Sequence, residues 1–413
     1  MVGLYYFEES ASHRQLLDLT LYDSIVPTFP GDTVNAPASV NSDRNVKADA
    51  KSKAIFTQAT YTPAILDDRL SVTVGGRYTK DERSATRTFL KNHSVYGALP
   101  GEVGASNDQE FSKFNPSVTV NMNWSNELST YAKVVTGYKA GGSSEAGPIG
   151  NFGITFDPEE VTTYEIGMKS YWWDQRVRLN VAAYYSEFDD MQLAFAADPI
   201  DSSVVQSQNA GSATVRGGEI ELMVMPIDDL TFTLDISLLD AEFDEVEVLA
   251  GTAFDPGFNP YSPYHVGQNI KNVFVMPYAP EKSFNLGAEY VAYRFEQGDI
   301  TAHVNYRWQD EQALTANAGS AVPNHKNSWQ PSFGTLDARL TLAFKLPRGD
   351  SAKIGLWGKN VLNKEYKTHV IGQGGAVNAP DQFTGAEVLA GYNSQAVAWA
   401  EPPSYGVELV YEY

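Results

Sequence analysis

The chain has 413 residues, no cysteine and a formal net charge of −21, with 51 acidic against 30 basic side chains. The lack of cysteine excludes a disulfide scaffold, a thiolate zinc site and a cysteine nucleophile, and the acidic balance excludes general affinity for nucleic-acid phosphates. Mean hydropathy is −0.30, and no apolar run approaches the ~18 residues of a membrane helix. A transmembrane β-barrel stays compatible with these values, because its apolar side chains occupy alternate positions.

Helical patterns are weak, whereas alternation of apolar and polar residues is widespread and predicts fourteen β segments. In chain order these are 1–9, 50–64, 69–81, 110–124, 128–140, 159–172, 176–192, 212–226, 230–244, 278–294, 299–311, 331–346, 351–363 and 400–413. Long connections alternate without exception with turns of about three or four residues, such as Ser125-Asn126-Glu127. The weakest point of the pattern is 10–49, where residues 16–22 leave room for another strand.

The alternation of connection lengths indicates a meander with tight turns at one end and long loops at the other. This is the pattern of an all-β, antiparallel transmembrane β-barrel with periplasmic turns and extracellular loops. On average the predicted segments are more than twice as long as the ~5–6 residues usual for soluble strands, and they are long enough to cross an apolar band ~25 Å tall at a tilt. A soluble all-β fold is the alternative.

The two faces of the predicted strands differ in polarity. On the last segment one face carries Tyr405, Val407, Leu409, Tyr411 and Tyr413, and the other carries Gly406, Glu408, Val410 and Glu412. A Lys or Arg that faces lipid near the midplane costs about 2–4 kcal/mol, so the polar faces are expected to line a watery or plugged lumen. Aromatic residues near segment ends are expected in interfacial girdles; they are Tyr138, Tyr171, Trp172, Trp173, Tyr306, Trp308, Tyr411 and Tyr413.

Catalytic motifs are missing from the sequence. There is no HExxH, no Walker A loop and no G-x-S-x-G. The six histidines are scattered, without the i, i+2 or i, i+4 spacing of a local metal site. We therefore expect no enzyme activity, no cofactor and no metal site.

The long loops carry aromatic and cationic side chains that are candidates for ligand binding. They are Tyr261, Tyr264 and His265 in loop 245–277, His325 and Trp329 in loop 312–330, and Tyr392 and Trp399 in loop 364–399. Aromatic faces and cations outside a barrel mouth suit an anionic ferric chelate or a glycan. Loop packing, or contact with lipopolysaccharide, would explain the same residues.

Several motifs occur in a fixed order along the chain. They include Gly137-Tyr138-Lys139-Ala140-Gly141-Gly142 and stretches at 157–170, 182–192, 209–221, 359–366 and 402–413. Together, over residues 1–413, they resemble the barrel of TonB-dependent outer-membrane receptors of the siderophore-receptor type. Two positions depart from that family, which commonly has an arginine near Pro403 and a terminal phenylalanine where this chain has Tyr413.

The resemblance implies a receptor in the outer membrane of a Gram-negative bacterium, which takes up a scarce ligand with energy from TonB. The implied ligand is a ferric siderophore or a similar chelate, and the implied partners are TonB, outer-membrane lipid and lipopolysaccharide. Barrels of the family have twenty-two strands and an N-terminal plug that contacts TonB. We therefore expect residues 1–413 to be the C-terminal part of such a barrel, with the plug and signal peptide outside them. A passive porin-like channel remains the second interpretation.

Overall fold

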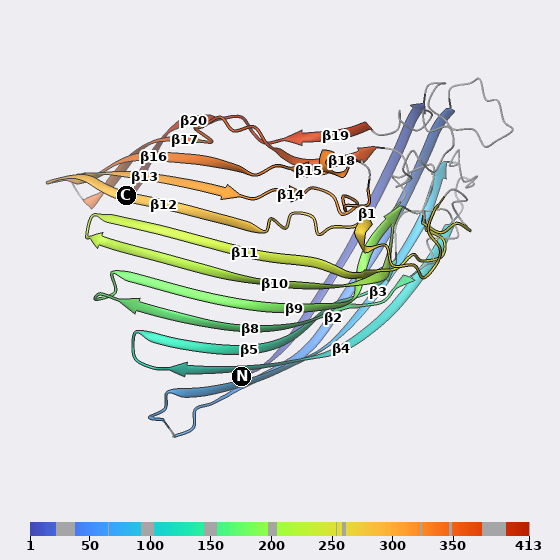
Figure 1. Cartoon of the computed structure of the whole chain (residues 1–413), viewed down its shortest axis with the longest axis horizontal. Coiled ribbons are helices and arrows are strands. Elements are labelled where there is room, and N and C mark those ends of the chain that lie inside the picture. The colour runs from blue at the N-terminus through green and yellow to red at the C-terminus, as the bar shows by residue number, and fades with distance from the viewer. Residues whose placement is uncertain are drawn as a thin grey trace.

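A single large antiparallel sheet dominates the computed structural model (Figure 1), which describes residues 1–21, 38–64, 66–91, 103–143, 155–196, 205–252, 254–257, 262–322, 324–346, 349–373 and 394–412. The sheet has fourteen strands that pair in chain order. They are β1 (Val2–Leu21), β2 (Ala38–Tyr61), β3 (Leu70–Lys91), β4 (Val103–Asn123), β5 (Leu128–Lys139), β8 (Glu159–Trp172), β9 (Val177–Ala196), β10 (Val205–Ile227), β11 (Leu230–Val246), β12 (Lys282–Phe295), β13 (Gly298–Gln309), β16 (Phe333–Lys345), β17 (Ser351–Lys359) and β20 (Ser404–Glu412).

The long connections contain smaller elements. In the described residues they include three two-stranded sheets. These pair β6 (Gly142–Ser143) with β7 (Thr155–Phe156), β14 (Gln312–Ala313) with β15 (Trp329–Gln330), and β18 (Lys367–Gln373) with β19 (Ser394–Trp399). Two 3₁₀ turns, η2 (Lys271–Val273) and η3 (His325–Ser328), lie in the same connections. Within the described part of the chain, no helix has the length and apolar character needed to cross a membrane.

All fourteen predicted segments correspond to strands of the sheet, but several strands are longer than predicted. Residues 16–21 continue β1, and the described part of 10–49 contains no additional strand. β3 likewise extends to Lys91, and β10 begins at Val205. The extensions of β3 and β10 carry polar residues on both faces, so they lack the alternation from which strands were predicted. Residues 16–21 do alternate, and they continue β1 instead of forming the separate strand for which the sequence left room.

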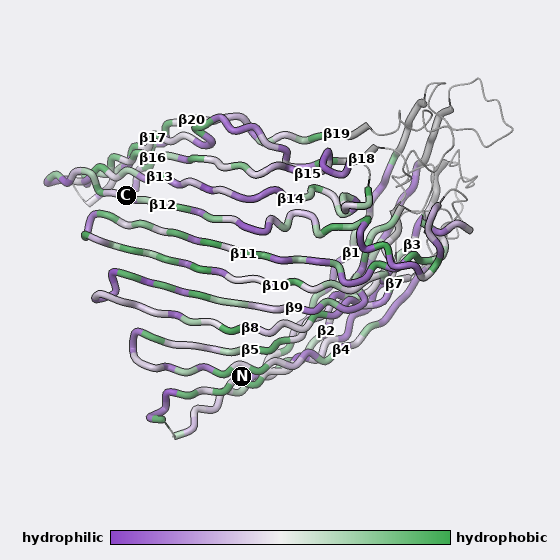
Figure 2. The backbone as a smooth tube through the Cα atoms, viewed as in Figure 1, coloured by the Kyte–Doolittle hydropathy of each residue, from purple (hydrophilic) through white to green (hydrophobic). Residues whose placement is uncertain are grey.

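The register of the sheet sorts side chains into apolar and polar rows. One row across six strands is entirely apolar: Leu230, Tyr290, Ala302, Leu340, Leu356 and Val407. A row on the opposite face is polar across nine strands: Asn123, Ser129, Lys169, Asn180, Glu221, Asp235, Asn285, Arg307 and Thr335. Figure 2 shows both hydrophobic and hydrophilic residues along the strands, as expected when alternate side chains meet different solvents.

The polar face is the inner, concave face of the curved sheet. Arg339 of β16 forms an ion pair with Glu408 of β20, and the two side chains reach across the intervening strand β17. Arg339 lies on the same face as Thr335, and Glu408 lies on the face opposite to Val407, so both belong to the polar face. Contacts that skip a strand require the side chains to converge, as they do inside a curve. Tyr138 was expected in an interfacial girdle; its hydroxyl instead bonds to the buried Asp81.

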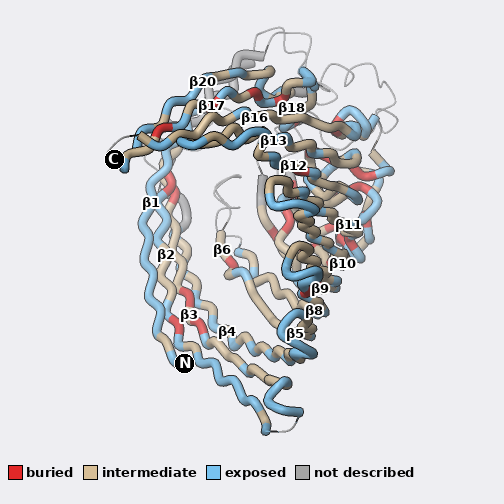
Figure 3. The backbone as a smooth tube through the Cα atoms, turned by 90° about the vertical axis from the view of Figure 1, so that its left-hand side faces the viewer, coloured by how far each residue is buried: buried red, intermediate tan, exposed pale blue. Residues whose placement is uncertain are grey.

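The apolar face is the convex face, and it is exposed. Leu340, Leu356 and Val407 expose 45%, 51% and 72% of their surface. In Figure 3, which is turned by 90° from Figure 1, the sheet curves into a ring-like section, and β1–β4 run across the view. β1 and β20 each pair with one neighbour only, so the sheet of described residues is not closed. An apolar surface of this extent outside the curve needs an apolar environment.

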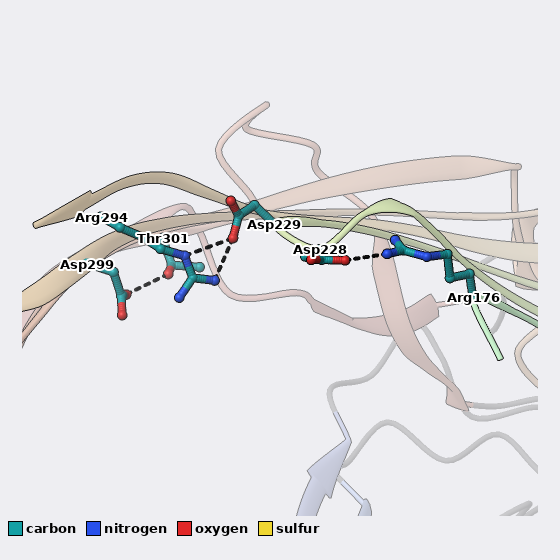
Figure 4. A network of polar contacts seen from close by, with 6 residues as sticks. All are labelled: Arg176, Asp228, Asp229, Arg294, Asp299 and Thr301. Carbon is teal, nitrogen blue, oxygen red and sulfur yellow. Dashed lines mark hydrogen bonds and ion pairs between the residues drawn. The ribbon is translucent and has the colours of Figure 1, made fainter. Parts of the chain in front are cut away.

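Ion pairs link the short turns to one another (Figure 4). Arg176, beside the β8–β9 turn, contacts Asp228 of the β10–β11 turn at 2.5 Å. Arg294, at the end of β12, donates from Nε and a terminal nitrogen to Asp229 at 2.9 and 2.5 Å. Asp299 accepts a hydrogen bond from Thr301 beside them. Three successive turns of the same sheet end are therefore joined through exposed charges.

Candidate ligand site at the long-loop end

The connection between β5 and β8 is held by two amide side chains from neighbouring strands. Gln192 of β9 donates from Nε2 to the carbonyl of Ala140 at 3.1 Å and to that of Asp157 at 3.0 Å. Asn209 of β10 donates to the Asp157 carbonyl at 2.9 Å and to the Asp190 carbonyl at 2.7 Å. Its Oδ1 accepts from the Asp157 amide at 2.6 Å. All five residues belong to the motifs that carry the family resemblance, which gives those motifs a structural role.

An aromatic core fixes the beginning of the connection between β11 and β12. The ring of Phe274 lies 5.7 Å from that of Phe195 and 5.8 Å from that of Phe254. Phe254 also lies 5.9 Å from Tyr264. Phe195 and Phe254 are almost fully buried, and buried aromatic rings are among the largest apolar contributions to stability. The loop therefore has its own hydrophobic core above the end of β9–β11.

Backbone hydrogen bonds join this connection to the one between β13 and β16. The amides of Val275 and Tyr278 donate to the carbonyls of Ala316 and Ala313, both at 2.9 Å. The amide of Gly319 donates to the Val273 carbonyl at 3.0 Å. A Cβ atom at Gly319 would lie 2.3 Å from the carbonyl oxygen of Asn272, so the two backbones approach closely because this residue is glycine.

The β18–β19 hairpin attaches to the same two connections. Lys367 donates from Nζ to the carbonyls of Asn327 and Trp329, at 3.0 and 3.2 Å. The hydroxyl of Tyr278 and Nδ1 of His369 form a hydrogen bond of 2.7 Å. We call the described residues of 247–281, 310–332, 367–373 and 394–399 the loop body. Figure 1 shows β14, β15, β18 and β19 at one end of the sheet.

The candidate residues from the loop near β11 take two different positions. Tyr264 packs against the aromatic core, and burial raises the pKa of its phenol, so the side chain is neutral and in contact with Phe254. The next residue, His265, is exposed, and its backbone amide bonds to Gln268 within a tight turn. Tyr261 and Tyr392 lie outside the described residues. Of this pair of neighbours, His265 is the more exposed, whereas Tyr264 is half-buried.

Lys367 connects the backbones of Trp329 and Trp399, which lie in different connections. Trp399 pairs with Lys367 across β18–β19, and Lys367 Nζ bonds to the backbone of Trp329. Nζ of Lys326 lies 3.9 Å from the Trp329 ring centroid and pairs with Glu311 at 2.7 Å. His325 is half-buried, and its Nδ1 lies 3.1 Å from a carbonyl oxygen within its own 3₁₀ turn region. Trp329 and Lys326 therefore place an aromatic face beside an ammonium group in the loop body.

Three residues of the loop body were not identified as candidates from the sequence. Tyr278, Lys367 and His369 connect the loops, but the β18–β19 hairpin and its register were not predicted. Residues 367–371 are three polar residues followed by two apolar ones, so the sequence carries no period-two signal for this hairpin. Within the described residues no group of three or more His, Asp or Glu side chains is arranged to hold a metal ion.

The fold and this end of the sheet define a class of protein. The antiparallel sheet is curved, with an apolar convex face and a polar concave face, and it has tight turns at one end and structured long loops at the other. This is the architecture of an outer-membrane receptor barrel. The family model for the β-barrel of TonB-dependent receptor-like proteins matches residues 3–361. The chain belongs to the TonB-dependent receptor family.

Solved structures with the same fold support this assignment. The ferric yersiniabactin uptake receptor FyuA from Yersinia pestis superposes with a TM-score of 0.65 at 16% identity, over 100% of this chain and 51% of that protein. The closed form of the ferric-catecholate import receptor Fiu from K12 E. coli gives 0.63 at 14% identity, over 100% and 51%. The ferric preacinetobactin receptor BauA from Acinetobacter baumannii gives 0.56 at 16% identity, over 100% and 55%. The chain thus spans about half the length of the structures it matches.

Proposed function

We propose that this chain is part of the barrel of an outer-membrane receptor that takes up a ferric siderophore or a similar chelate. The observation that carries the proposal is the loop body, in which three connections present Trp329, Trp399, Lys326 and His265 at the mouth side of a sheet with a polar concave face. Exposed aromatic rings and ammonium groups suit a ligand that is anionic and carries flat, polarisable groups. The names of the similar structures, which are ferric-chelate receptors, agree with this ligand class.

The proposal extends to the rest of the receptor. Because the similar structures are about twice as long, we assign the fourteen strands to the C-terminal part of a longer barrel domain. TonB would supply energy through a plug contributed by the remaining polypeptide. Outer-membrane lipid and lipopolysaccharide would cover the convex face, and a Gram-negative outer membrane is the location that this face requires. Sequencing of the reading frame on both sides of these 413 codons tests the assignment.

A binding experiment tests the ligand class. Detergent-purified protein is titrated with ferric catecholate, ferric hydroxamate and ferric citrate, and binding is followed by isothermal titration calorimetry. We expect one class to bind, and Trp329→Ala and Trp399→Ala to weaken it about fivefold to thirtyfold, because a cation–π or stacking contact contributes about 1–2 kcal/mol. Trp173→Ala, at the opposite end of the sheet, is the matched control and should leave affinity unchanged. Failure of all three chelates to bind, or equal losses in all variants, would contradict the proposal.

A passive channel is the second candidate, and the polar concave row from Asn123 to Thr335 is the observation that favours it. Conductance in planar lipid bilayers separates the two functions. Stable pores of one size, together with no chelate binding, would favour the channel. We expect no stable pores of single size, because β1 and β20 each have an unpaired edge.

A further inference from the structure

Asn360 closes the turn that leads from β17 to β18, which we call the Asn360 turn (residues 360–366). Its Nδ2 donates to the carbonyl of Lys364 at 2.9 Å, and its Oδ1 accepts a hydrogen bond from the Lys364 amide, also at 2.9 Å. The backbone amide of Asn360 donates to Oδ1 of Asp337 in β16 at 2.8 Å. Asn360 is buried, so it joins the two sides of the turn from within and attaches the turn to a neighbouring strand.

Asn363 lies in the same turn and differs from Asn360 in one respect only. Both residues have a left-handed backbone, with φ of 52° and 49°, a conformation that asparagine adopts more readily than most residues. The side chain of Asn363 is exposed and forms no hydrogen bond with a described residue. Both asparagines therefore suit the backbone of the turn, but only Asn360 holds it through the side-chain amide.

A pocket of about 320 Å³ lies between the Asn360 turn and the segment that joins β19 to β20. The turn contributes Asn363, Lys364 and Glu365 to its lining, and the other segment contributes Trp399, Ala400 and Glu401. Trp399 exposes 59% of its surface, so a ligand can reach its ring. The turn that Asn360 closes is therefore one wall of the pocket in which the accessible Trp399 lies.

The end of the Asn360 turn is held by contacts that do not involve Asn360. The ring of Tyr366 stacks on that of Phe333 with the centroids 4.0 Å apart. The carbonyl of Tyr366 accepts a hydrogen bond from the Ala400 amide at 2.9 Å. Because the turn is anchored at Tyr366 and at the backbone of Asn360, loss of the Asn360 side chain would release the part between them, around Lys364, without detaching β18.

We propose that Asn360 is a positioning residue for chelate binding, and this inference rests on the proposed function. Asn360 is buried and does not line the pocket, so it does not touch the ligand. It holds residues 363–365 in place opposite Trp399, and the ligand enters a pocket whose two walls are already ordered. Without the Asn360 side chain, binding has to order this wall, and ordering a loop at the moment of binding lowers affinity.

The test compares Asn360→Gly with Asn363→Gly in the full chain purified in detergent. Glycine adopts the left-handed backbone at both positions, so the two variants differ in the loss of the bridge to Lys364. The probes are the ferric catecholate, ferric hydroxamate and ferric citrate used above, again followed by calorimetry. We expect Asn360→Gly to weaken the chelate that binds about fivefold. Asn363→Gly is the matched control, and we expect it to leave the affinity unchanged.

A double-mutant cycle separates positioning from a general loss of stability. If Asn360 acts through the wall opposite Trp399, Asn360→Gly causes no further loss of affinity in a Trp399→Ala background, because coupled residues are not additive. A purely structural role would lower the affinity by the same factor in both backgrounds. Equal affinities of the two glycine variants, or equal losses in the two backgrounds, would overturn the positioning role.

Hydrogen exchange gives a second reading that needs no chelate. We expect the amides of 361–365 to exchange faster in Asn360→Gly than in Asn363→Gly, because only the first variant removes the acceptor of the Lys364 amide. Equal exchange in the two variants would show that Asn360 does not order the wall, and the inference would fail. If the parent protein binds none of the three chelates, the proposed function fails, and exchange in 361–365 still tests the role of Asn360.

Discussion

The two ends of the sheet are ordered by different forces. At the short-turn end, Trp173, Asp174 and Gln175 adopt left-handed backbone angles of 53°, 53° and 66° in φ, and exposed ion pairs connect successive turns. At the long-loop end, a buried aromatic core and backbone bonds between separate connections form the loop body. The turns are therefore specified by neighbouring residues, whereas the long-loop end depends on contacts between residues far apart in sequence.

The difference predicts unequal sensitivity to mutation. Exposed ion pairs contribute about 0–1 kcal/mol each, whereas truncating a buried phenylalanine costs about 3–5 kcal/mol. Damage to the loop body should also stay local, because its core packs on the ends of β9–β11 and leaves the rest of the sheet register untouched. The following substitutions examine this difference, beginning with the largest expected effect.

Phe254→Ala removes the ring that contacts Phe274 and Tyr264. We expect a loss of about 3–5 kcal/mol in the local stability of the loop body, because the ring leaves a cavity. Limited proteolysis with mass spectrometry should detect faster cleavage within 247–281 and no change at the short turns. Trp173→Ala, where 77% of the side chain is exposed, serves as the control. Equal protection in both variants would show that the aromatic core does not order the loop.

Val304→Arg places a charge on the convex face, and Asn305→Arg places the same charge on the concave face one residue later. We expect the first to destabilise the protein in a bilayer by about 2–4 kcal/mol, because arginine would face lipid near mid-strand. The second should have little effect, since it faces polar side chains. Urea titration of the protein folded into lipid vesicles measures both. Equal stabilities would argue that the convex face does not contact lipid, and would favour the soluble alternative.

Gln192→Leu leaves the carbonyls of Ala140 and Asp157 with one donor fewer at the base of the β5–β8 connection. We expect a loss of about 1–3 kcal/mol, the usual cost of unpaired partly buried polar groups. Hydrogen exchange in residues 139–160 should accelerate. Gln309→Leu is the control, because Gln309 forms no side-chain hydrogen bond within the described residues. Unchanged exchange in Gln192→Leu would remove the structural role given to that motif.

Asp229→Asn breaks the ion pair with Arg294 at the short-turn end. We expect a loss of no more than about 1 kcal/mol, and we expect it to shrink at high salt because both side chains are exposed. Asp174→Asn, in a neighbouring turn and without an ion pair, is the control. Thermal unfolding in 0.05 M and 1 M NaCl measures the difference. A large, salt-independent loss would show that the turn end depends on more than local conformation.

The strands were predictable because apolar and polar residues alternate along each one, according to the environment that each face meets. In 299–311 and 400–413, apolar residues at every second position identify the convex face, and the register confirms this assignment. The upper parts of β2–β4 were missed because they carry polar residues on both faces, whereas residues 16–21 were recognised as a possible strand but not as the continuation of β1. The aromatic candidates Tyr264 and Trp399 were recognised as loop residues, but sequence alone could not separate the packed Tyr264 from the exposed Trp399.

The sequence by itself therefore determined the number and order of the strands, the alternation of turns and loops, and the polarity of the two faces. These properties follow from local periodicity, since successive side chains of a strand point to opposite faces and therefore meet different solvents. Only the tertiary structure decided that Lys367 joins Trp399 to Trp329, and that Phe254 and Phe274 order a loop. Such contacts depend on register and curvature across several strands, which no single segment of the sequence contains.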